Sequence, residues 1–290
     1  MQDNIFPAAI FLTEAETFLL FSQDFPAHNL GFVDAKIDTI ELEIAGRDFQ
    51  FRQSPGLLTS NREEGTTGAV LWKITPLVAA WLATLPPILG DLGILYKDAT
   101  ILELGCGVTG LIGLTLARTV SSYIFSDQAY IMRYLRENLL ANAQKTSDRP
   151  TKHSKANQHA GKSKFDLEKL KTVTLDWERD SAENVRQVLR PSERIDTVIV
   201  CDCVYNDYLI RPLVQTCADI CGLGSKDGGC TKLLVAQQLR SDSIFESFMQ
   251  ALMEKFHVWR MPDDHLSTEL RTGSGYAVHV AMLRHGPLDS

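Results

Sequence analysis

The chain has 290 residues, of which 44% are hydrophobic and 22% are charged, and its formal net charge is −7. This apolar content is sufficient for one large globular domain that needs neither disulfides nor a metal to fold. An acidic chain lacks the basic surface with which proteins neutralise phosphates, so we expect no direct nucleic-acid substrate.

The amino-terminal segment and the cysteines favour a cytoplasmic protein, with the nucleus as the other location. Residues 1–18 carry acids among apolar residues, without the basic start and continuous apolar core of a signal peptide. No run approaches the roughly 18 apolar residues that span a bilayer. We therefore expect reduced cysteines, and because their spacing matches no paired C-x2-C zinc pattern, no metal site is predicted.

A β-hairpin is the first element expected along the chain. Residues 36–52 alternate apolar and polar side chains around the turn Ala45-Gly46-Arg47. We interpret the hairpin as part of an accessory amino-terminal extension, residues 1–67, ahead of a main domain, residues 68–290. A helix is expected at the start of that domain, over Pro76–Leu85.

Short apolar runs alternate with helical segments from Thr100 onward, which is typical of strand-helix-strand units in a mainly parallel sheet. The seven expected strands are Thr100–Leu104, Tyr123–Ser126, Thr172–Leu175, Thr197–Cys201, Lys232–Ala236, His257–Arg260 and Tyr276–Leu283. Residues 146–164 are rich in Lys, Ser, Asn and His and nearly devoid of large apolar residues. We expect a flexible insert there, and a basic arm for ribosomal RNA or an acidic partner is the alternative.

A glycine-rich turn follows the first of these strands. Gly105-Cys106-Gly107-Val108-Thr109-Gly110 has the spacing G-x-G-x-x-G, which lets the backbone approach a ligand closely. Dinucleotide enzymes share this spacing. Glu103 precedes the first glycine by two residues, and a carboxylate there favours a cationic sulfonium cofactor over a pyrophosphate. The turn therefore predicts S-adenosylmethionine as the cofactor.

Two further residues after strand ends fit an adenosine ligand. Asp127 ends the second strand, where a carboxylate can accept hydrogen bonds from both ribose hydroxyls, although it could also cap the next helix. Trp177 follows the third strand, where an indole can flank the adenine or simply pack in the core. Trp72, ahead of the first core helix, has the same two interpretations.

Asp202 and Tyr205 follow the fourth strand. The carboxyl ends of the strands in an open α/β sheet share one crevice, so these side chains should border the glycine turn. A carboxylate and a phenol there can orient an amine. The alternative is that Asp202 caps the following helix and Tyr205 packs beneath it.

With these positions in hand, residues 68–284 resemble the seven-β-strand protein-lysine methyltransferases that carry a D-x-x-Y motif. The resemblance rests on ELGCGVTGL, Ser126-Asp127, Leu175-Asp176-Trp177 and Cys201-Asp202-Cys203-Val204-Tyr205. It implies a Rossmann-like α/β sheet in the strand order 3-2-1-4-5-7-6, with the seventh strand antiparallel, and methyl transfer to a lysine on another protein. It also implies cofactor contacts by Trp72, Gly105, Cys106, Gly107, Asp127, Trp177 and Cys201.

Within that group, the hairpin, the insert and CDCVYNDYLIRPLVQT look most like the fungal ribosomal lysine methyltransferases. This likeness implies a monomeric enzyme that acts on a large-subunit ribosomal protein. Another cytosolic protein, such as a translation factor or a chaperone, remains an alternative substrate.

Two other classes of function compete with this interpretation. An oxidoreductase with the same glycine turn usually carries a Tyr-x3-Lys pair or a dedicated histidine near the crevice, and neither follows the fourth strand. A non-catalytic module that keeps the cofactor fold for partner binding would not need an intact set of acids and glycines. The presence of Glu103, Asp127, Asp202 and Tyr205 beside the glycine turn favours an enzyme.

Overall fold

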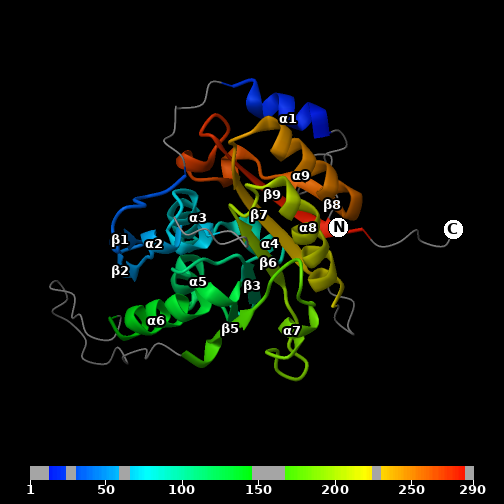
Figure 1. Cartoon of the computed structure of the whole chain (residues 1–290). Helices are drawn as coiled ribbons and strands as arrows, with labels where there is room; N and C mark the ends of the chain where they lie inside the picture. The colour runs from blue at the N-terminus through cyan, green and yellow to red at the C-terminus, as the bar shows by residue number, and fades with distance from the viewer. Residues whose placement is uncertain (1–12, 24–30, 59–65, 146–166, 224–229, 285–290) are drawn as a thin grey trace.

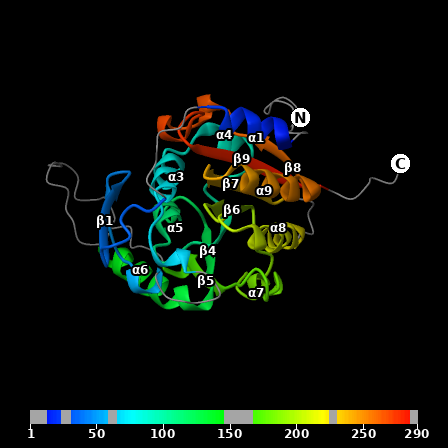
Figure 2. The ribbon, with the colours of Figure 1, turned by 45° about the horizontal axis from the view of Figure 1, so that its top comes forward.

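Helices cover both faces of a seven-stranded sheet, as the two views of the chain show (Figures 1 and 2). The computed structural model describes residues 13–23, 31–58, 66–145, 167–223 and 230–284. The insert predicted at residues 146–164 lies outside these ranges.

The sheet has the predicted strand order. Its strands are β3 (Thr100–Leu104), β4 (Ser122–Asp127), β5 (Leu170–Thr174), β6 (Thr197–Cys201), β7 (Lys232–Gln238), β8 (Phe256–Arg260) and β9 (Tyr276–Leu283). They lie in the order β5-β4-β3-β6-β7-β9-β8. Strand β9 runs opposite to the other six, so its pairs with β7 and β8 are antiparallel and the remaining pairs are parallel. Counted from β3, this is 3-2-1-4-5-7-6, so the prediction is confirmed. Every residue of β3 and β6 is buried, as expected for strands covered on both faces.

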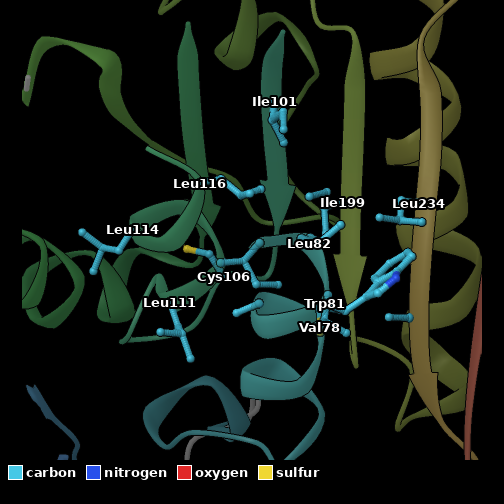
Figure 3. Close-up of a cluster of buried hydrophobic side chains, with 14 of the residues drawn as sticks. Val78, Trp81, Leu82, Ile101, Cys106, Leu111, Leu114, Leu116, Ile199 and Leu234 are labelled. Carbon is cyan, nitrogen blue, oxygen red and sulfur yellow. The ribbon is translucent and has the colours of Figure 1, made fainter. Parts of the chain in front are cut away.

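The helices divide between the two faces according to the clusters that their apolar side chains join. On one face are α3 (Ile74–Ala83), α4 (Pro87–Asp91), α5 (Leu111–Leu116) and α6 (Ala129–Lys145), and on the other are α1 (Thr13–Phe21), α7 (Glu183–Arg186), α8 (Asp207–Gly222) and α9 (Asp242–Lys255). Figure 3 shows Leu82 of α3 beside Ile199 of β6, and Val78 and Trp81 farther along the same helix. The strands carry alternate side chains into each cluster, so Ile101 joins the first and Leu102 the second.

The hairpin is present, and its turn is tighter than the predicted one. It consists of β1 (Thr39–Ile44) and β2 (Arg47–Arg52), which leaves Ala45 and Gly46 as the turn. Their φ angles of 50° and 72° are both positive, as a two-residue type I′ turn requires. Arg47 belongs to β2, where it pairs with Ile44. A short helix, α2 (Pro55–Leu58), follows.

Two asparagines of α6 act as a pairing partner for the outer edge of β2. The Asn142 side chain accepts from Gln50 N at 2.9 Å and donates to Gln50 O at 2.8 Å. Asn138 does the same for Arg52, with distances of 2.8 and 2.9 Å. The two asparagines are four residues apart and so share one helix face, which matches alternate residues of the strand. The hairpin is thereby fixed to α6, which packs on the seven-stranded sheet, and the domain boundary at residue 67 stays a prediction.

Helix α1 was not anticipated from the sequence, and it is attached to the sheet by a buried ionic cluster. Its Glu16 side chain lies 3.1 Å from Nε2 of His279 on β9 and 3.6 Å from Nη1 of Arg260 on β8. Leu20 joins the apolar cluster on the same side as α9. A nine-residue helix offers too few turns for its period to stand out in the sequence.

All six cysteines are free thiols, and five of them are buried. Among the described residues, no helix is long and apolar enough to cross a membrane.

We predict that Glu16→Gln destabilises the fold in a pH-dependent way. Burial alone would raise the pKa of Glu16, but its hydrogen bond to His279, with the charges of His279 and Arg260, lowers it below the usual 4.5. A lowered pKa means that the ionised form stabilises the fold at neutral pH and that this contribution is lost as the pH falls through the folded-state pKa. The variant should lose about 1–3 kcal/mol at pH 7.

Thermal unfolding between pH 3 and pH 7 measures this effect, with Glu14→Gln as the control because Glu14 is exposed on the same helix. The difference between Glu16→Gln and the parent should narrow below about pH 4. A difference that does not change with pH would contradict the ionic attachment.

Candidate active site

A cleft opens at the carboxyl ends of β3, β4 and β6 and encloses about 780 Å³ of empty space, its open mouth included. Of the ten residues predicted for the site, nine line the cleft: Trp72, Gly105, Cys106, Gly107, Asp127, Trp177, Cys201, Asp202 and Tyr205. The structure therefore brings together residues from five separate segments of the chain, and only Glu103 is left out.

The glycine turn requires glycine for both conformational and steric reasons. Gly105 and Gly107 have φ angles of +67° and +63°, in the left-handed region. A Cβ atom on Gly105 would lie 2.7 Å from Sγ of Cys203 and 3.2 Å from Cζ2 of Trp177. The floor of the cleft is thus backbone, which a ligand can approach closely.

Asp127 joins the glycine turn to the end of β4. Its Oδ2 accepts from Gly107 N and its Oδ1 accepts from Gln128 N, both at 2.8 Å. Burial raises the pKa of Asp127 to about 6, although these two hydrogen bonds lower it. Each oxygen therefore accepts one hydrogen bond from the backbone and has capacity for a second, on a residue that lines the cleft. Helix α6 begins at Ala129, so Gln128 rather than Asp127 has the capping position.

Two tryptophans line the cleft: Trp72, which precedes the glycine turn in the sequence, and Trp177, which follows it. The Trp177 ring lies against the glycine turn, and its Nε1 is buried with no hydrogen-bond acceptor among the described residues. Because Trp177 lines the cleft, this buried donor is the atom for which a ligand acceptor is sought. Trp72, in contrast, donates from Nε1 to Thr67 O at 3.0 Å, so only its ring is available to a ligand.

Glu103 does not reach the cleft. Its carboxyl group is buried on the α3 and α5 face of β3, where the hydroxyl of Tyr123 donates to it at 2.7 Å. Burial raises the pKa of Glu103 to about 7, against the lowering effect of the Tyr123 hydrogen bond. Its position at a strand end was read correctly, but the alternation of side chains along β3 directs it into the core.

Asp202 and Tyr205 lie in the loop between β6 and α8, as expected. Helix α8 is capped by Asn206, whose side chain accepts from Tyr208 N at 3.1 Å, so Asp202 does not have the capping role. Burial raises the pKa of Tyr205, partly offset by a hydrogen bond with the Thr67 side chain.

Arg240 is a residue of the site that the sequence analysis missed. Its guanidinium forms an ion pair with the buried carboxylate of Asp202, and its Cζ lies 4.7 Å from the centre of the Trp72 ring. An available signal was its place two residues after β7, whose carboxyl end meets the same edge of the sheet as β6.

The sheet order, the antiparallel last strand and a cleft built on a glycine turn define a Rossmann-like methyltransferase fold. Residues 52–255 match the lysine methyltransferase family, and the chain belongs to that family. Membership confirms the predicted class of enzyme, a protein-lysine methyltransferase that uses S-adenosylmethionine.

Several curated proteins are similar to this chain. The ribosomal lysine N-methyltransferase 5 of Zygosaccharomyces rouxii is 28% identical, over 73% of this chain and 72% of its own. That of Vanderwaltozyma polyspora is 25% identical, over 82% of this chain and 86% of its own. A Schizosaccharomyces pombe protein named diaminohydroxyphosphoribosylamino-pyrimidine deaminase is 28% identical over 84% of this chain, which spans about half (52%) of its length.

Among solved structures, the tRNA (uracil-54, C5)-methyltransferase of Pyrococcus abyssi in complex with S-adenosyl-L-homocysteine aligns with 86% of this chain and 45% of its own. The TM-score is 0.39 and the sequence identity is 13%.

We predict that Gly105→Ala weakens the binding of S-adenosylhomocysteine, the product form of the cofactor, at least about tenfold, equivalent to 1.4 kcal/mol. The added methyl group would crowd Cys203 and Trp177. Gly93→Ala is a matched control because Gly93 has the same φ of +67° and no atom within 4 Å of its would-be Cβ.

Calorimetric titration and thermal unfolding of both variants separate backbone strain from crowding. Gly93→Ala should lower the unfolding temperature and leave binding unchanged. Parent-like affinity in a folded Gly105→Ala variant would show that the turn is not part of the binding site.

Proposed function

We propose that this chain methylates a lysine side chain of a large-subunit ribosomal protein, with S-adenosylmethionine as methyl donor. The observation that carries the proposal is the cleft itself, in which the glycine turn, Asp127 and Trp177, whose Nε1 has no acceptor among the described residues, surround one cavity in a chain of the lysine methyltransferase family. The names of the fungal relatives support the ribosomal substrate.

The polar and aromatic groups of the cleft fit the proposed cofactor. Asp127 offers each ribose hydroxyl one carboxylate oxygen. Trp177 offers the adenine an aromatic ring and an indole N–H. The backbone at Gly105 and Gly107 leaves room for the methionine portion, beside Cys106 and Cys201. The hydrogen bond between Glu103 of β3 and Tyr123 of β4 joins the two strands whose ends border this part of the cleft.

The acceptor amine must be neutral to react, and the cleft favours that state. When bound, S-adenosylmethionine supplies an electrophilic methyl group. A lysine has an unperturbed pKa of about 10.4, which desolvation in a partly apolar cleft lowers. Tyr205 borders the cleft on the side of Asp202, where its ring and hydroxyl can hold the amine in position. Positioning of this kind lowers the barrier by several kcal/mol.

The remaining features of the proposal follow from the sequence. A net charge of −7 is complementary to a basic protein partner, which favours encounter with ribosomal proteins. We propose a monomer of the cytoplasm or nucleus, with residues 68–290 as the methyltransferase domain and residues 1–67 as its extension.

We predict that the purified protein transfers label from radioactive S-adenosylmethionine to one protein of large ribosomal subunits isolated from cells that lack the enzyme. Mass spectrometry of the labelled band should find the methyl groups on a lysine. Tyr205→Ala should bind S-adenosylhomocysteine like the parent and transfer at least about tenfold more slowly, because it loses only acceptor positioning. Label on a non-ribosomal protein of an extract, with none on the subunits, would contradict the ribosomal substrate.

We predict that cofactor affinity falls as the pH drops through about 6. The pKa of Asp127 is raised to about 6, and only the ionised carboxylate accepts hydrogen bonds from both ribose hydroxyls without competition from its own proton. Asp127→Asn should weaken S-adenosylhomocysteine binding by about 1–3 kcal/mol and flatten its pH dependence.

Titrations between pH 5 and pH 8 check this expectation. Asp98→Asn serves as the charge control because Asp98 is exposed and does not line the cleft. The ribose assignment fails if Asp127→Asn binds like the parent across this range.

A further inference from the structure

Arg240 is bound to Asp202 by a fork of two hydrogen bonds. Its Nη1 donates to Oδ1 of Asp202 at 2.8 Å, and its Nη2 donates to Oδ2. The same Nη2 also donates to Oε1 of Gln238 at 2.9 Å. The Asp202 side chain is 1% exposed and that of Arg240 is 19% exposed, so little water competes with this pair. A bidentate Arg–carboxylate pair fixes geometry as well as charge.

Most of the accepting capacity of Asp202 is used by the protein itself. Besides Arg240, Gln237 Nε2 and Gln238 N donate to Oδ1 at 3.1 and 3.3 Å. Three donors thus share Oδ1, and Oδ2 accepts from Arg240. Asp202 also has a φ of +58°, an uncommon conformation that these bonds help to hold. The orientation of the carboxylate is therefore set by its neighbours in the chain.

Arg240 also contacts the wall of the cleft that carries Trp72. Its Cζ lies 4.7 Å from the centre of the Trp72 ring, a cation–π distance, and the ring of Phe32 lies 4.3 Å from that of Trp72. A Cβ atom on Gly31 would be 2.4 Å from Trp72 and 2.8 Å from Nη2 of Arg240. The backbone at Gly31 thus packs closely against both side chains.

We propose that Arg240 is a positioning residue that couples the two sides of the cleft, by holding Asp202 and Trp72 in one arrangement. Asp202 belongs to the side that carries Tyr205, and Trp72 to the side formed ahead of α3. In this arrangement Asp202 anchors Arg240, and Arg240 in turn fixes the direction in which the Asp202 carboxylate faces beside Tyr205. The inference rests on the proposed function only where turnover is measured.

Two variants of Arg240 test the coupling. Arg240→Met removes the charge and the fork but keeps an unbranched side chain, whereas Arg240→Lys keeps the charge and removes the fork. Arg211→Met is the control because the Arg211 side chain is 80% exposed. We expect Arg240→Met to weaken S-adenosylhomocysteine binding at least fivefold through Trp72, and Arg240→Lys to recover less than half of that loss. The control should bind like the parent.

A double-variant cycle separates coupling from a general loss of stability. Asp202→Asn and Arg240→Met should each weaken S-adenosylhomocysteine binding, and the double variant should be no weaker than the worse single variant, because the two residues act as a unit. The kcat for large ribosomal subunits should fall in the same non-additive pattern. Arg240→Lys with Asp202→Asn gives the same cycle if Arg240→Met does not fold.

Two results would overturn the proposal. One is parent-like S-adenosylhomocysteine binding in a folded Arg240→Met or Arg240→Lys variant, and the other is multiplication of the two single losses in the double variant. S-adenosylhomocysteine binding needs no methyl acceptor, so a wrong ribosomal substrate would leave this test intact. A parent protein that does not bind S-adenosylhomocysteine would instead refute the proposed function.

Discussion

The reversal of the chain at the end of β3 is the constraint on which the site depends. A strand buried on both faces must end and lead into α5 within six residues, at the floor of a cavity. Only left-handed glycines allow that turn, and a side chain at Gly105 would collide with Cys203. Neighbouring elements then hold the backbone, since Cys106 N donates to Ser126 O and Val108 N donates to Gly68 O. The cavity forms because the carboxyl ends of β3, β4 and β6 meet around this turn.

Two aspartates border the cleft, and their hydrogen bonds divide the work between them. Asp127 receives one backbone N–H on each oxygen, which keeps it in place and leaves a lone pair on each oxygen for a ligand. Asp202 receives four donors from its own chain, two of them from Arg240. The same residue type therefore serves as a ligand group on one side and as an anchor on the other. The bidentate, largely buried ion pair fixes the geometry of Asp202 as well as its charge.

The local pattern of the sequence was sufficient to predict the strands and the glycine turn, because both depend on neighbouring residues. Three of the seven sheet strands have the expected bounds, and the others differ by one or two residues at one or both ends. The local pattern did not predict the direction of a side chain at a strand end, nor contacts between residues far apart in the sequence. Glu103 was placed at the correct strand end, but its side chain points to Tyr123. Arg240 is 38 residues from Asp202, so only the pairing of β6 with β7 brings them together. Helix α1 is fixed by Glu16 and His279, 263 residues apart.

Asn138 connects the amino-terminal hairpin to the same glycine turn. Its amide nitrogen donates to Arg52 O of β2 and to Val108 O of the turn, at 2.9 and 2.8 Å. Its oxygen accepts from Arg52 N. The side chain is buried, and these bonds within the protein satisfy its polar atoms. Helix α6, which carries Asn138, starts two residues after Asp127. Asn138 thus fixes the hairpin, the glycine turn and α6, the helix that follows Asp127, relative to one another. The hairpin is therefore a physical support of the site rather than a separate appendage.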